Sequence, residues 1–63
     1  MQTTYTICFF NSKGRMLRMT AKRYPNVQEA IRLAASECGY GERIEIFDGD
    51  RQCWSGLPSQ VAA

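Results

Sequence analysis

Histidine is absent from this 63-residue chain, which removes the side chain used most often in acid–base catalysis and metal binding. A zinc site would need all three cysteines, Cys8, Cys38 and Cys53, plus a carboxylate, and their wide spacing matches no metal motif. An odd number of cysteines also argues against a disulfide framework. We therefore predict no metal, no cofactor, and reduced thiols that serve as small apolar side chains.

Long apolar runs and targeting signals are lacking as well. No run approaches the roughly 20 apolar residues that a membrane-spanning helix requires. Residues 1–5 lack the basic and then apolar regions of a secretory signal. The sequence therefore predicts a cytoplasmic protein that does not associate with membranes.

Catalytic signatures are also missing. The chain contains no glycine-rich phosphate loop and no imidazole that would activate Cys8 as a nucleophile. Asp48 and Asp50 lack the later ligands of a calcium loop, and a tight turn around Gly49 explains both of them. We predict that the protein is not an enzyme.

Acidic residues are missing from the first part of the chain. Residues 1–28 contain five basic and no acidic residues, whereas residues 29–63 contain three basic and six acidic residues. The net charge of +2 therefore divides into +5 and −3. Such asymmetry is compatible with an anionic ligand or with self-association of opposite ends, but a basic hairpin exposed to water is the simpler explanation.

The hydrophobic pattern that is present changes its period from two to about 3.6 and back to two. Residues 5–10 and 16–22 alternate as strands, and a type I turn with Gly14 in the left-handed conformation predicts that Asn11 pairs with Arg15. Residues 27–38 carry an apolar stripe at helical spacing behind a cap at Asn26. Two further strands, over 43–47 and 52–55, flank a tight turn.

These elements predict an α+β fold of ββαββ order, in which one helix packs on one face of a four-stranded antiparallel sheet of order 2-1-3-4. Residues 1–56 form a single domain, and residues 57–63 form a short flexible tail. The face under the helix is predicted to carry Tyr5, Ile7, Phe9, Leu17, Met19, Ala21, Ile44, Ile46 and Cys53.

The opposite side of the sheet, which we call the open face, is predicted to carry Cys8, Phe10, Met16, Phe47 and Trp54 among Arg18, Lys22, Arg43 and Glu45. These apolar groups would form a patch of order 500 Å², large for a monomer of this size. The assignment of Trp54 depends on a regular last strand, because an extra bulge there would turn the indole toward the helix.

Such a face predicts a protein-interaction module that acts as a homodimer or as a binder or inhibitor of another protein, as bacteria and phages encode. Phe10, Met16, Phe47 and Trp54 are the predicted apolar anchors, and Arg18, Lys22 and Arg43 are the predicted polar contacts. One alternative is a single-stranded nucleic-acid-binding module, in which the aromatics stack on bases. Another is that the segment around Leu57, Pro58 and Val61 covers the aromatic side chains.

Overall fold

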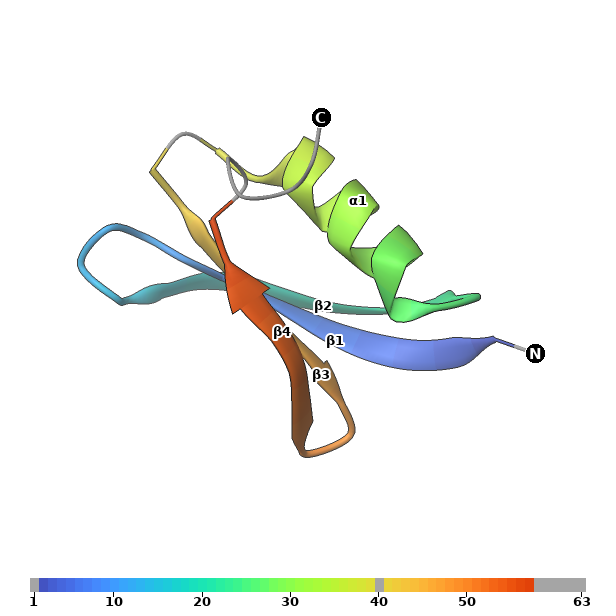
Figure 1. Ribbon diagram of the computed structural model, residues 1–63. Coiled ribbons are helices and arrows are strands. Elements are labelled where there is room, and N and C mark those ends of the chain that lie inside the picture. The colour runs from blue at the N-terminus through green and yellow to red at the C-terminus, as the bar shows by residue number, and fades with distance from the viewer. Residues whose placement is uncertain (1, 40, 58–63) are drawn as a thin grey trace.

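The computed structural model describes residues 2–39 and 41–57, which form four strands and one helix in the order ββαββ. The elements are β1 (Thr3–Phe10), β2 (Met16–Tyr24), α1 (Val27–Glu37), β3 (Arg43–Asp48) and β4 (Arg51–Gly56). Neighbouring strands are antiparallel in the order β2-β1-β3-β4, and α1 lies on one side of the sheet (Figure 1). The predicted fold class, strand order and helix position are confirmed.

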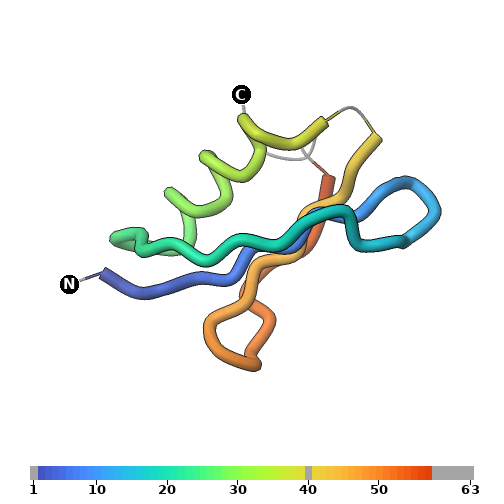
Figure 2. The backbone as a smooth tube through the Cα atoms, turned by 180° about the vertical axis from the view of Figure 1, so that it is seen from behind, coloured from blue at the N-terminus to red at the C-terminus, as the bar shows by residue number. Residues whose placement is uncertain are grey.

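The loop between β1 and β2 forms as predicted. The Asn11 N–H donates to the Arg15 carbonyl at 2.9 Å, and the Gly14 N–H donates to the Asn11 carbonyl at 3.0 Å. The φ angle of Gly14 is +84°, a left-handed value that a Cβ atom makes unfavourable. This hairpin loop extends well beyond the helix (Figure 2).

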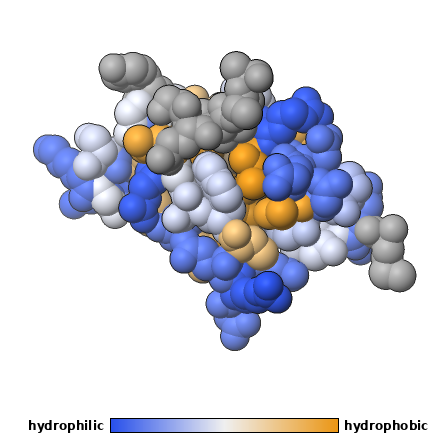
Figure 3. Space-filling model, in the orientation of Figure 1, coloured by the Kyte–Doolittle hydropathy of each residue, from blue (hydrophilic) through white to orange (hydrophobic). Residues whose placement is uncertain are grey.

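The helix begins and packs as its sequence pattern predicts. The Asn26 side-chain oxygen accepts a hydrogen bond from the Glu29 N–H at 3.0 Å. Ala30, Ile31 and Ala34 are buried against the sheet, and the small alanines let the helix lie close to the strands. Figure 3 shows hydrophilic residues at the outer side of the helix and at the β3–β4 turn, with an apolar strip between helix and sheet.

One core lies between α1 and the sheet. Its buried members are Tyr5, Ile7, Phe9, Tyr24, Ala30, Ile31, Ala34, Ile44 and Ile46. Val27, Ala35, Cys38 and Trp54 pack around it while partly exposed.

The register of β2 differs from the prediction. Phe10 pairs with Met16, as the loop requires, but Phe9 pairs with Arg18, because a β-bulge makes Leu17 an extra residue. From Arg18 onward, each side chain therefore points to the face opposite to the predicted one. The prediction that Leu17, Met19 and Ala21 pack under the helix is wrong, and all three are exposed.

Tyr24 supplies the physical reason for this bulge. In a regular register the ring of this last β2 residue would lie on the open face, whereas the bulge turns it to the helix side, where it is buried. Its ring centroid lies 6.4 Å from that of Tyr5. Burying an aromatic ring removes roughly 150–250 Å² from water, which offsets the comparable area that Leu17 and Met19 leave exposed.

The last strand, β4, also contains a bulge. Ile46 pairs with Trp54 but Phe47 pairs with Gln52, so Cys53 is the extra residue. Trp54 therefore shares the helix face with Ile46 and packs against the core, and its predicted place on the open face is wrong. Cys53, predicted to face the helix, is exposed. The large indole gains more from partial burial than the small thiol loses by exposure.

The predicted C-terminal tail is described only at its first residue, Leu57, and residues 58–63 lie outside the described residues. The alternative in which Pro58 and Val61 cover the aromatic side chains therefore also falls outside the described part of the chain.

Candidate functional site

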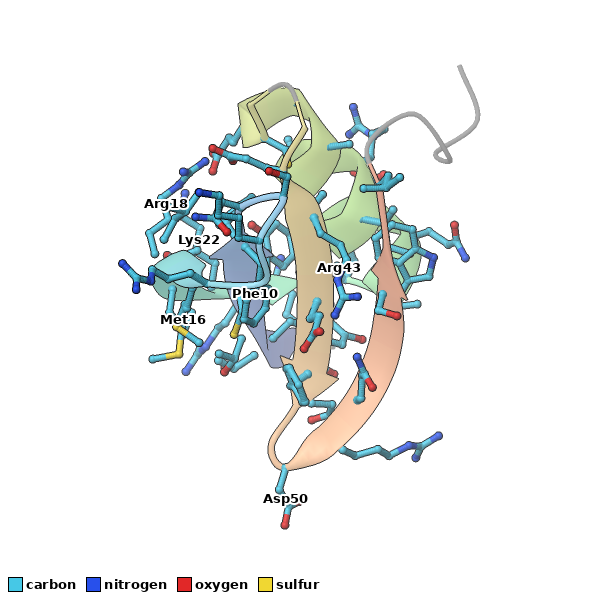
Figure 4. All side chains as sticks on the ribbon, turned by 90° about the vertical axis from the view of Figure 1, so that its left-hand side faces the viewer. Phe10, Met16, Arg18, Lys22, Arg43 and Asp50 are labelled. Carbon is cyan, nitrogen blue, oxygen red and sulfur yellow. The ribbon has the colours of Figure 1, made fainter. Side chains whose placement is uncertain are left out.

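The strand register defines which side chains share the open face. They are Thr4, Thr6, Cys8 and Phe10 of β1, Met16, Met19, Ala21 and Arg23 of β2, Arg43, Glu45 and Phe47 of β3, and Gln52 and Ser55 of β4. Of the predicted binding residues, Phe10, Met16, Arg43 and Phe47 belong to this set. Phe10 is paired with Met16 on one side and with Arg43 on the other, which places the three in one row across the sheet (Figure 4).

Three predicted binding residues lie elsewhere. Arg18 and Lys22 follow the bulge of β2 and lie on the helix side, and Trp54 follows the bulge of β4 and packs on the core. The predicted arrangement of these three on the open face is therefore wrong. The open face loses its largest ring and two of its three predicted cations.

Met19 is a large apolar residue of the open face that the sequence pattern did not indicate. Its side chain is 62% exposed. Alternation assigned backward from Tyr24 would have placed Met19 on the open face, since a large aromatic residue just before a helix favours the buried side of the sheet. Alternation from a buried Tyr24 places Lys22, Thr20 and Arg18 toward the helix and Met19 away from it.

The middle of the open face is closed by its own side chains. Cys8 pairs with Met19 on β2 and with Glu45 on β3, and it is buried although no helix covers it. Burial raises the pKa of the Cys8 thiol, and the negative charge of Glu45 raises it further. Because a protonated thiol is a poor nucleophile, Cys8 acts as an apolar filling group rather than a reactive one.

An open depression of about 560 Å³ lies where the open face meets the β1–β2 loop. It is lined by Phe10, Asn11, Ser12, Gly14, Gly41, Arg43, Glu45 and Leu57. The Arg43 guanidinium lies 5.9 Å from the Phe10 ring centroid and forms an ion pair with Glu45. Since the charge of Arg43 is compensated, this depression suits an apolar side chain better than an anion.

Seven of the nine residues of the β2 strand are exposed. Tyr24 is its single buried residue, while Met16 is 49% and Leu17 is 46% exposed. Together with Met19, these side chains form a run of large apolar groups along an edge strand. We call these three residues the β2 apolar run. Edge strands also present unpaired backbone N–H and C=O groups, so β2 offers both apolar side chains and hydrogen-bonding groups.

Four cations beside this run have no acidic partner among the described residues: Lys13, Arg15, Lys22 and Arg23. By contrast, Arg32 pairs with Glu29, and Arg43 pairs with Glu45. The hairpin of β1 and β2 therefore keeps an uncompensated positive charge, which attracts anionic groups over about a Debye length of 8–10 Å.

Arg18 has a structural role that the sequence did not indicate. Its guanidinium carbon lies 4.1 Å from the Phe9 ring centroid, and its Nη2 donates to the Glu37 carbonyl at 2.9 Å. The same nitrogen lies 3.5 Å from the Glu42 carboxylate. This side chain fastens the C-terminal end of α1 to β2, so its guanidinium is already engaged by groups of this chain.

Within residues 2–39 and 41–57, no group of three acidic or cysteine side chains lies close enough to hold a metal ion. No helix in the same part of the chain has the length and apolar character needed to cross a membrane. Comparison of the chain with protein-family models, curated proteins and solved structures finds no match. The surface itself is therefore the basis for a functional conclusion.

Proposed function

We propose that this protein is a non-enzymatic interaction module that binds another polypeptide through β2 and the adjoining open face. The observation that supports this proposal most directly is the β2 apolar run, whose three side chains are 46–62% exposed on an edge strand. Exposed apolar groups rimmed by polar residues mark protein–protein contact sites. Met and Arg, both present here, are enriched in such interfaces.

The size of the apolar run sets the scale of the interaction. At roughly 200 Å² for a large side chain, half-exposure of three residues gives roughly 300 Å² of apolar surface. Its removal from water at about 25 cal/mol per Å² contributes about 7 kcal/mol, a gain comparable with the cost of association. Apolar contact alone therefore supports a weak complex, and tighter binding requires the charges and the free backbone edge of the same strand.

A second copy of this chain fits β2 less well than a different partner does. Antiparallel pairing of two β2 strands would bring the cations of one copy beside those of the other, with Arg18 directly opposite Lys22 when residues 16–24 overlap in full. Like charges in directly opposed positions destabilise a strand pair. The uncompensated cations of this hairpin favour a partner with acidic groups.

The unpaired cations also favour the second candidate function, binding of single-stranded nucleic acid. Aromatic rings for stacking on bases are less available, since Trp54 packs on the core and the Phe10 ring faces Arg43. A phosphate backbone offers no apolar group that would pack against the β2 apolar run. These features make a polypeptide the better partner.

Site-specific photocrosslinking tests the proposal. A p-benzoylphenylalanine replaces Met19 in one protein and Leu33 in a matched control, because Leu33 is also a large exposed apolar residue but lies on the helix. After irradiation in cells that carry the gene, we expect adducts with another protein from position 19 and not from position 33. Adducts that nuclease removes, adducts of two copies of the chain, or equal adducts from both positions would each overturn the proposal.

A further inference from the structure

No strand of the described residues pairs with the outer edge of β2, and this edge has a regular stretch long enough to receive another strand. Beyond the bulge, the seven residues from Arg18 to Tyr24 pair without interruption with residues of β1 from Phe9 back to Thr3. At about 3.3 Å per residue this stretch spans roughly 23 Å. It contains no proline, so every residue retains its N–H, and alternate residues direct their N–H and C=O groups away from β1.

The other edge of the sheet is less suited to strand addition. The β4 strand has six residues, and the Cys53 bulge interrupts its register. Its exposed side chains are Arg51, Gln52, Cys53 and Ser55, which include no large apolar group. Strand addition gains affinity from the backbone and specificity from alternate side chains, and β2 provides both.

The side chains along this stretch specify the chemistry of an added strand. Met19 and Ala21 point to the open face, so the residues beside them should be apolar. Lys22 on the helix side and Arg23 on the open side are adjacent cations without an acidic partner among the described residues. Two consecutive acidic residues would therefore lie beside them, one on each side of the sheet.

We infer that β2 binds an extended segment of a partner protein as a fifth strand, and that this segment carries two consecutive acidic residues followed by alternating apolar and polar residues. This inference rests on the proposed function and specifies its binding mode. In antiparallel pairing, a six-residue segment of sequence Glu-Glu-Val-Thr-Ile-Thr satisfies the pattern. Its glutamates lie beside Arg23 and Lys22, and its valine and isoleucine lie beside Ala21 and Met19.

N-methylated versions of this peptide separate backbone pairing from side-chain contact. One labelled peptide is N-methylated on alternate residues, which leaves one pairing edge and prevents the peptide from forming fibrils. A second peptide is N-methylated on every residue and has no pairing edge, although its side chains and charge are the same. A third has the two glutamates replaced by lysines and keeps the single edge.

Fluorescence anisotropy with the full chain is the measurement. We expect the one-edge acidic peptide to bind, and the lysine peptide and the no-edge peptide each to bind at least about tenfold more weakly. The double substitution Lys22→Glu with Arg23→Glu should weaken the acidic peptide by about tenfold as well, and should improve binding of the lysine peptide. Both residues are exposed, so far-ultraviolet circular dichroism of the variant should match the wild type.

Amide hydrogen exchange adds a structural readout, since pairing with the peptide should slow exchange at alternate β2 positions. Equal binding of the one-edge and no-edge peptides would refute strand addition. Equal binding of the acidic and lysine peptides would refute acidic specificity. Displacement of the acidic peptide by an equimolar oligothymidylate would assign β2 to nucleic acid instead. The peptide experiments can refute strand addition or acidic specificity even when position 19 still forms adducts with another protein. The binding mode and the proposed function are therefore tested separately.

Discussion

Replacement of Arg18 by alanine is expected to destabilise the fold much more than replacement of an ordinary exposed residue. The side chain is 47% exposed, yet it contacts Phe9 of β1, the Glu37 carbonyl at the end of α1, and the Glu42 carboxylate. The residues that it contacts belong to β1, to the C-terminal end of α1, and to the segment between α1 and β3. Loss of the guanidinium would release this end of the helix from the sheet.

The magnitude follows from the three contacts. A cation over an aromatic ring at an exposed site contributes about 0.5–1 kcal/mol. A charge-assisted hydrogen bond at a helix C-terminus contributes about 0.5–1 kcal/mol after solvent screening, and an exposed ion pair contributes about 0.2–0.5 kcal/mol. The variant Arg18→Ala should therefore lose about 1.2–2.5 kcal/mol of unfolding free energy, which lowers Tm by roughly 10 °C for a domain of this size.

Thermal and urea denaturation followed by circular dichroism measure this loss. Lys22→Ala is the matched control, since Lys22 is a cation on the same side of the same strand without an ion pair among the described residues, and it should change the free energy by less than about 0.5 kcal/mol. Arg18→Lys keeps the charge but loses the planar stacking group, so it should recover part of the stability. If Arg18→Ala and Lys22→Ala cost the same, the fastening role of Arg18 is refuted.

Three further predictions concern the bulges and the thiols. Trp54→Ala should lower the unfolding free energy by about 2–3 kcal/mol, because the indole packs on the core, whereas Met19→Ala should cost less than about 0.5 kcal/mol. Equal losses in urea denaturation would contradict the Trp54 register. A thiol reagent should modify exposed Cys53 first and Cys8 last. The raised pKa of Cys8 means that its contribution to stability is complete below the ordinary thiol pKa and is lost as pH rises toward the folded-state value. Urea midpoints at neutral and alkaline pH should therefore differ more for the wild type than for Cys8→Ala, and an unchanged difference would exclude this role for Cys8.

Local sequence determines most of the architecture. Asn11 and Gly14 specify the first hairpin loop, and Asn26 specifies where the helix begins, because each acts through hydrogen bonds or backbone angles within a few residues. The change of hydrophobic period separates strands from helix. Together these signals predict the ββαββ order and the strand order of the sheet without reference to any tertiary contact.

The two β-bulges separate the site residues that the sequence placed correctly from those that it misplaced. Phe10, Phe47 and Arg43 lie on strands without an extra residue, and Met16 precedes the extra residue of β2, so alternation from the turns placed all four correctly. The misplaced residues follow a bulge: Arg18, Met19 and Lys22 on β2, and Trp54 on β4. A single inserted residue turns every later side chain of its strand to the opposite face, so a register error of one residue assigns these side chains to the wrong face of the sheet.

Local sequence signals therefore specify the set of elements and their order, because turn residues, a helix cap and periodic hydrophobicity act over short distances. Tertiary packing decides which side chains of the edge strands β2 and β4 face the helix and which lie on the open face. Packing toward the helix removes the rings of Tyr24 and Trp54 from water, whereas a regular ladder would leave both rings on the open face. That comparison depends on the space between helix and sheet, which exists only once the chain has folded.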